Sequence, residues 1–377
     1  AVSDAGVPML DFAAQHGPIE EQLIEKATEV IRSGRYILGP EVEAFEREVA
    51  DYLGIEHAVG VSSGTDALLL ALMSLGIGPG DEVITTTFSF FATGGCIARV
   101  GATPVFVDIE PDTFNVDVEQ VAAAVTERTR AIVPVHLFGQ ACDMHGLRAI
   151  ADEHDLPIIE DAAQSIGARS AAGPIGGGGA YACFSFFPAK NLGALGDAGL
   201  LTARDADAAE RARVLRAHGG KPKYHHALIG GNFRIDALQA ALLRVKLPAL
   251  DGWTLERKAN AARYDAAFAE ANLPEDLLRP PVRRFESHVY NQYVVRSSAR
   301  DALASHLRSE GIATAIYYPI PLHRQECFAE LGYREGSLPV SERASAEVLA
   351  LPIFPGLGAA RQQRVIDAAI SFLDGLR

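Results

Sequence analysis

Residues 184–199 read FSFFPAKNLGALGDAG, a strand rich in aromatic residues followed by a loop with regularly spaced glycines. Lys190 lies where the strand gives way to the loop. An ammonium group in apolar surroundings costs free energy, so this lysine must be paired, reach water, or be kept neutral for chemistry. Most lysines are solvent-exposed, and a solvated loop lysine is the simplest alternative. The neighbouring segments decide between these roles.

The stretch ends a block of alternating strand-like and helical segments that starts at Glu82. The runs EVITTT, TPVFVDI, AIVPVH and PIIED alternate with FATGGCIARVG and with helices expected from about Asp117 and Asp143. Apolar strands that alternate with helices predict an α/β fold with a mostly parallel sheet buried on both faces. Ligands of such sheets bind at the carboxyl ends of the strands.

Helical segments over 18–33 and 41–53 precede this block, and helical segments over 205–217 and 235–271 follow it. A second α/β unit then contains HVYNQYVVR, a helix near 300–310, IATAIYY and two C-terminal helices. We therefore expect a large domain over residues 1–248 and a small C-terminal domain over 249–377.

Composition excludes several classes of protein. The 377 residues carry a net charge of −14, which argues against nucleic acid or an anionic membrane as the main partner. No apolar run approaches the roughly 18 residues of a membrane span, and the N-terminal segment does not resemble a secretory leader. The four cysteines lack CxxC spacing, so we expect reduced thiols, a cytoplasmic location and no zinc site.

The glycine cluster AAGPIGGGGA, residues 171–180, precedes the expected strand AYACFSFF. A dinucleotide-binding loop must instead follow a strand and open a helix. We therefore interpret the cluster as a flexible connection.

Two further stretches place polar groups after expected strands. In VGVSSGTDALLLAL, a helix that starts at about Gly64 directs free amides of Gly64 and Thr65 toward an anion, although a plain helix cap explains the same pattern. In LPIIEDAAQS, Asp161 follows an apolar strand and Gln164 lies three residues on. Asp161 could cap a helix or pair with a cation such as a protonated pyridine.

Ser185 and a basic segment complete the candidate site. Ser185 lies between two aromatic residues of the expected strand and can donate its hydroxyl to a phosphate oxygen. Asn232 and Arg234 precede the helix expected from about Ile235. Cationic and histidine side chains gather in an otherwise acidic chain at Arg216, His218, Lys221, Lys223, His225 and His226. These histidines lack the spacing and partners of a metal site.

Together, the motifs SGTDAL, TFSF, EDAAQS, FSFFPAKNLG and GNFRIDALQAA resemble the fold-type I, pyridoxal phosphate (PLP) dependent nucleotide-sugar aminotransferases of the DegT/StrS type. The resemblance runs from SGRYILGPEVEAFE into IYYPIPLH and covers nearly the whole chain. It implies a seven-stranded, mostly parallel sheet in the large domain, a homodimer with shared active sites, and PLP as the cofactor, with a pyridoxamine form during the reaction.

The resemblance also assigns roles to residues. Lys190 would form the Schiff base and transfer protons, and Asp161 would bind the pyridine nitrogen. The other expected contacts are Gln164 near the ring oxygen, Phe88 stacked on the ring, Gly64, Thr65 and Ser185 at the phosphate, and Asn232 at the phosphate of the neighbouring subunit's cofactor. Candidate substrate contacts are Lys221, Lys223, Tyr224 and Arg234, with Tyr317 and His323 on the sugar side.

The reaction implied by the resemblance moves an amino group from L-glutamate to a nucleotide-linked keto sugar. Relatives that act on 4-keto sugars follow the lysine with a pattern like K-x-I-T-x-x-E-G-G, whereas KNLGALGDAG resembles the 3-keto branch. The expected acceptor is a thymidine diphosphate 3-keto-6-deoxy sugar, with a uridine diphosphate 3-keto uronate second. The alternatives are a 4-keto sugar, a keto-inositol, or a regulatory PLP-binding protein; related dehydratases have histidine in place of the lysine.

Overall fold

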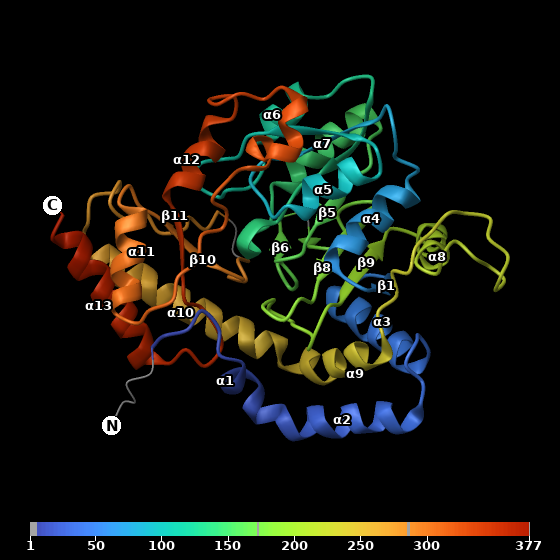
Figure 1. Ribbon diagram of the computed structural model, residues 1–377, viewed down its shortest axis with the longest axis horizontal. Helices are drawn as coiled ribbons and strands as arrows, with labels where there is room; N and C mark the ends of the chain where they lie inside the picture. The colour runs from blue at the N-terminus through green and yellow to red at the C-terminus, as the bar shows by residue number, and fades with distance from the viewer. Residues whose placement is uncertain (1–5, 172, 285–286, 377) are drawn as a thin grey trace.

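A central sheet of seven strands organises the part of the chain that the computed structural model describes, residues 6–171, 173–284 and 287–376 (Figure 1). Its spatial order is β1 (His57–Val61), β9 (Gly199–Ala203), β8 (Tyr181–Ser185), β5 (Ile159–Asp161), β4 (Thr129–Val133), β2 (Glu82–Thr86) and β3 (Thr103–Val107). Backbone hydrogen bonds of Asp161 with Pro134 and His136, at 2.9 and 3.0 Å, join β5 to the segment after β4. Only β9 runs antiparallel to its neighbours. The predicted α/β fold with a mostly parallel seven-stranded sheet is confirmed.

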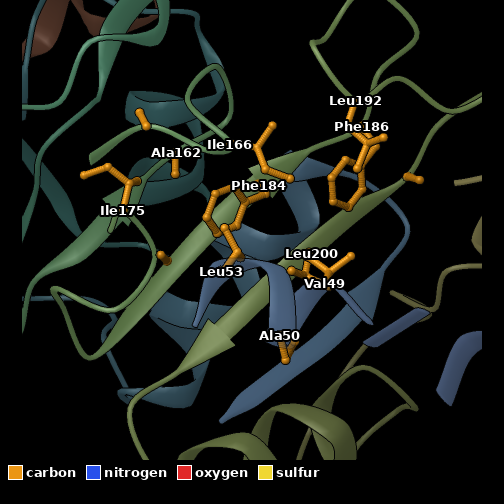
Figure 2. Close-up of a cluster of buried hydrophobic side chains, with 14 of the residues drawn as sticks. Val49, Ala50, Leu53, Ala162, Ile166, Ile175, Phe184, Phe186, Leu192 and Leu200 are labelled. Carbon is orange, nitrogen blue, oxygen red and sulfur yellow. The ribbon is translucent and has the colours of Figure 1, made fainter. Parts of the chain in front are cut away.

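Both faces of the sheet are covered, because successive side chains point to opposite faces and nearly all of them are buried. One core contains Val83 and Cys183, and it packs against α4 (Gly64–Ser74), α5 (Ala92–Arg99) and α8 (Ala206–Leu215). The opposite core contains Ile84 and Phe184; Figure 2 shows Phe184 beside Leu53. The helices of this second face are α3 (Pro40–Leu53), α6 (Val118–Ala123), α7 (Met144–His154) and α9 (Ala237–Lys246), with α2 (Glu20–Ser33) outside α9.

Aspartate side chains start the helices that the sequence predicts. Asp117 and Asp143 accept hydrogen bonds from the first amides of α6 and α7, which fixes both starts at the expected positions. The long helix expected over 235–271 is interrupted, however, by a short 3₁₀ turn at Leu247–Ala249 that separates α9 from α10 (Leu250–Ala271). Pro248 lies in this turn, and its ring and missing N–H are incompatible with an uninterrupted helix.

The C-terminal segments form a separate apolar core. The antiparallel strands β10 (Tyr293–Arg296) and β11 (Val348–Leu351) pack with α10, α11 (Arg300–Ser309) and α13 (Ala359–Asp374). Val7, beside α1 (Phe12–His16), joins this core by bridging to Ile312. A domain boundary near residue 248 stays a prediction. Among the described residues, no helix is both long and apolar enough to cross a membrane.

The remaining elements are short. They are β6 (Arg169–Ser170), β7 (Gly173–Pro174), α12 (Pro339–Glu347) and the 3₁₀ turns Gly17–Ile19, Leu137–Gly139, Leu322–Arg324 and Glu326–Leu331.

Candidate active site

Asp161 ends β5 at the carboxyl edge of the sheet, and its side chain is buried. Oδ2 accepts a hydrogen bond from the Thr93 hydroxyl at 2.7 Å, and Oδ1 accepts one from the Ala163 amide at 3.2 Å. No helix starts after Asp161, which removes the helix-cap interpretation. Burial raises the pKa of Asp161, and the Thr93 bond opposes this effect. A cationic ligand at this carboxylate would offset the cost of burying its charge.

Lys190 lies in the turn after β8 with its side chain half-buried. Burial lowers the pKa of Lys190 to about 8, and the charge of Asp161 acts in the opposite direction. Among the described residues, no side chain binds the Lys190 amine. The solvated, fully exposed lysine considered above is therefore excluded. A partly desolvated amine without a counter-ion is a suitable nucleophile for a carbonyl carbon.

The first turn of α4 lies against the carboxyl end of β8. Ser63 caps the helix by accepting a hydrogen bond from the amide three residues on, at 3.0 Å. The amides of Gly64 and Thr65 have no acceptor in the described chain, so the cap leaves both free for an anion. A Cβ atom on Gly64 would lie 2.8 Å from the Cβ of Ser185. Only glycine therefore lets Ser185 come this close to the helix terminus.

Gln164 connects the segment after β4 to the C-terminal segments. Its Oε1 accepts a hydrogen bond from the Phe138 amide at 2.7 Å, and its Nε2 donates one to the Tyr318 hydroxyl at 3.1 Å. Sequence reasoning did not find Tyr318 or Thr93. The contact of Gln164 with Tyr318 and that of Asp161 with Thr93 each join residues far apart in the chain, so no local pattern indicates either of them.

Phe88 differs from its expected role. Its ring has no exposed surface and packs against Phe114 and Tyr318 at centroid distances of 5.9 and 6.1 Å. A ring enclosed in this way has no free face to offer a cofactor. Phe90, two residues further on, is 60% exposed and lies 6.4 Å from the Tyr318 ring. Its carbonyl accepts a hydrogen bond from the Thr93 amide, which links Phe90 to the residue that binds Asp161.

The basic segment is only partly available to a ligand. Arg216 is buried and binds Glu46 at 2.5 Å, so its guanidinium supports β1 instead of facing solvent. Lys221 forms an exposed ion pair with a glutamate of α8. Lys223 lies 5.0 Å from the ring centroid of Tyr224, which is 80% exposed. The segment that follows α8 extends away from the sheet in Figure 1.

Asn232 and Arg234 lie between this segment and α9. Asn232 is exposed, whereas Arg234 is half-buried beside the end of β1, where it bridges to Val61. The Nε atom of Arg234 is buried without a hydrogen-bond partner in the chain. The Nε atoms of Arg216 and Arg257 are buried without a partner in the same way, so this atom alone does not mark a binding site.

The two residues expected on the sugar side differ from each other. Tyr317 is half-buried, and burial raises its pKa. His323 is buried, with Nδ1 2.7 Å from the Thr87 hydroxyl and Nε2 3.0 Å from Glu342. Both nitrogens of His323 are thus engaged within the chain, and neither is free for a sugar. The expected substrate role of His323 is therefore not supported.

The glycine cluster binds a buried carboxylate. Glu160, next to Asp161 on β5, accepts hydrogen bonds from the amides of Gly178 and Gly179 at 2.7 and 2.9 Å. His136 Nε2 lies 2.9 Å from the same carboxylate. A Cβ atom on Gly179 would lie 2.4 Å from a backbone carbonyl oxygen. The flexible connection expected here is instead an anion-binding turn that supports β5.

The site thus combines an unpaired, half-buried amine, a buried carboxylate and free helix amides. These groups fit an aldehyde that carries a protonated ring nitrogen and a phosphate, which is the chemistry of PLP. A seven-stranded sheet with this donor set at its carboxyl edge defines a PLP-dependent enzyme. The chain belongs to the DegT/DnrJ/EryC1/StrS aminotransferase family, whose model matches residues 18–370. Two solved structures to which the chain is similar contain the cofactor, one in its pyridoxamine form and one as PLP.

Individual relatives match along nearly the whole chain. A pleiotropic regulatory protein of Geobacillus stearothermophilus is 50% identical over 97% of this chain and 98% of its own. The dTDP-3-amino-3,4,6-trideoxy-α-D-glucose transaminase of Streptomyces venezuelae is 46% identical over 96% and 95% of the two chains. The crystal structure of S. venezuelae DesV in complex with a ketimine intermediate superposes with a TM-score of 0.95, at 44% identity over 98% and 99%.

Proposed function

We propose that the protein transfers an amino group from L-glutamate to the 3-keto carbon of a nucleotide-linked hexose. The observation that carries the proposal is the half-buried, unpaired Lys190 amine in the same site as the buried carboxylate of Asp161. The similarity to a transaminase named for a 3-amino sugar supports the acceptor class. Thymidine diphosphate 3-keto-6-deoxy sugars remain our first choice, and uridine diphosphate 3-keto uronates our second.

In this proposal each residue of the site has a separate role. Bound PLP supplies an electron sink for the bond-breaking steps. Lys190 holds the cofactor and then, once free, moves the proton at the substrate carbon. Asp161 keeps the proton on the ring nitrogen, and Gln164 lies toward the ring oxygen. Gly64, Thr65 and Ser185 hold the phosphate, and Phe90 takes the stacking position predicted for Phe88.

We assign substrate binding to residues in and near the basic segment. Lys221, Lys223, Tyr224 and Arg234 are the candidates for the nucleotide diphosphate or the donor carboxylate, with Tyr317 on the sugar side. Among these candidates, Arg234 lies beside the end of β1, which leads into α4.

The exposed side chain of Asn232, beside the end of α8, is available to a second subunit in the homodimer that we propose. If Asn232 contacts the cofactor phosphate of the partner subunit, mixing inactive Lys190→Ala with inactive Asn232→Ala protein should restore activity. Heterodimers then contain one intact site, and at random mixing up to about a quarter of wild-type turnover should return. Absence of recovery, with subunit exchange verified by mass spectrometry, would place the action of Asn232 within its own chain.

The position of amination can be measured in a single turnover. Protein carrying the pyridoxamine form is mixed with matched 3-keto and 4-keto nucleotide sugars, and the return of PLP absorbance is followed. We expect the 3-keto sugar to react at least about a hundredfold faster, because a reacting carbon displaced by about 1 Å loses that much rate. A faster 4-keto sugar would refute the acceptor and leave the aminotransferase standing.

A regulatory protein without turnover is the second candidate, because a relative at 50% identity is named as a regulator. The same single-turnover measurement separates the two. Return of PLP absorbance with any keto sugar would contradict a purely regulatory role.

A further inference from the structure

A buried lysine of α9 contacts the loop that carries Lys190. Lys246 has no exposed surface, and its Nζ donates to the carbonyl oxygen of Gly193 at 2.8 Å. The same Nζ lies 3.0 Å from Nε2 of His16 in α1. Among the described residues, no carboxylate lies within ion-pair distance of Lys246, and burial lowers its pKa to about 8. An amine buried without a counter-ion is costly, so its contacts need an explanation.

His16 acts as an acceptor in this contact. Burial and the charge of Lys246 lower the pKa of His16 to about 4, so its ring is neutral near pH 7. A neutral imidazole has one acceptor nitrogen, and here Nε2 accepts a hydrogen bond from Nζ of Lys246. Lys246 therefore joins the N-terminal helix and the loop after Lys190 through two hydrogen bonds.

The loop itself is a closed turn with Lys190 near its tip. The amide of Ala194 donates to the Phe186 carbonyl at 2.7 Å, and the Lys190 amide donates to the Phe187 carbonyl at 2.8 Å. A Cβ atom on Gly193 would lie 2.2 Å from the carbonyl oxygen of Pro188. Gly193 thus packs directly against Pro188, two residues before Lys190. A shift of Gly193 therefore displaces Pro188 and the segment that leads to Lys190.

Helix α9 supports this turn at a second point. Gln239, two helical turns before Lys246, accepts a hydrogen bond from the Leu195 amide at 2.8 Å. Residues seven apart lie on the same face of a helix, so one face of α9 holds two successive parts of the loop. The buried amine is the inner of these two supports.

We infer that Lys246 is a positioning residue for the reaction: by holding the Gly193 carbonyl, it fixes the turn that presents the Lys190 amine to the cofactor. The inference rests on the proposed role of Lys190. A displacement of the reacting amine by about 1 Å would cost roughly a hundredfold in rate.

The test compares Lys246→Met with the wild type, both loaded with PLP. Methionine matches the lysine side chain as far as Cε but lacks Nζ, so the Gly193 carbonyl loses its donor. We expect borohydride to fix the cofactor on Lys190 at least about tenfold more slowly, and single-turnover amino transfer to slow by about 10–100-fold. Both rates are measured well below the melting temperature, with the adduct located by peptide mapping.

Two further variants separate positioning from stability. His16→Leu removes the other partner of Lys246 but retains the Gly193 bond, so we expect a lower melting temperature with fixation within about twofold of wild type. Gly193→Ala disturbs the same turn without changing a charge, should slow fixation as Lys246→Met does, and serves as the test if Lys246→Met does not fold. Wild-type fixation in folded Lys246→Met, or in Gly193→Ala when only that variant folds, would overturn the inference. A wild-type adduct on another lysine would instead contradict the proposed function.

Discussion

Lys190→Ala is expected to lower amino transfer by roughly 10⁴-fold or more, because one substitution removes both the covalent attachment and the proton transfer. The variant should still retain part of its PLP, since the free amides of Gly64 and Thr65 remain. Single-turnover absorbance with glutamate measures the loss, and dialysis measures cofactor retention.

Lys223→Ala is the control for the covalent attachment alone, because Lys223 is a candidate for substrate binding. Lys223 lies on the extended segment, so its removal should leave borohydride fixation on Lys190 unchanged. A reduced adduct on Lys221 or Lys223 in the wild-type protein would contradict the assignment. So would turnover of Lys190→Ala within tenfold of wild type.

Asp161→Asn is expected to lower turnover by at least about a hundredfold with the fold intact. The amide has nearly the same shape and can still accept the Thr93 hydrogen bond, but it carries no charge to keep the ring nitrogen protonated. The loss should appear in the single-turnover rate, and the absorbance of bound PLP should change.

Asp108→Asn provides a buried carboxylate outside the site for comparison. Asp108 accepts hydrogen bonds from the amides of Val340 and Ser341 at 2.8 Å. Its substitution should lower the melting temperature and leave the chemical step unchanged. If Asp161→Asn turned over at nearly the normal rate, Asp161 would be a structural carboxylate like Asp108.

Local patterns in the sequence predict much of this fold. Apolar strands that alternate with helices indicate a sheet buried on both faces, and Asp117 and Asp143 mark helix starts. Strand periodicity also explains why the adjacent residues Glu160 and Asp161 have different partners, because successive side chains on β5 point to opposite faces. The same alternation places the Glu160 carboxylate on the other buried face, where it needs donors, and the nearby glycine cluster provides them.

The stacking role expected of Phe88 and the sugar contact expected of His323 both depend on contacts between distant segments. The chain leaves β2 at Thr86, so strand alternation no longer shows whether Phe88 or Phe90 faces the site. His323 is bound by Thr87, 236 residues earlier in the chain. The bond from Thr93 to Asp161 likewise spans 68 residues. Such pairs depend on how the strands are ordered in space, which no short motif records.

The position of β9 has a consequence for how the enzyme is made during synthesis. β9 lies between β1 and β8, although β1 ends at Val61 and β9 starts only at Gly199. A Cβ atom on Gly199 would lie 2.4 Å from the carbonyl carbon of Ser63, so β9 packs directly against the start of α4. Closing so long a loop is slow and costs entropy. A nascent chain that ends before Gly199 therefore lacks the strand that joins β1, and the start of α4 that follows it, to the rest of the sheet.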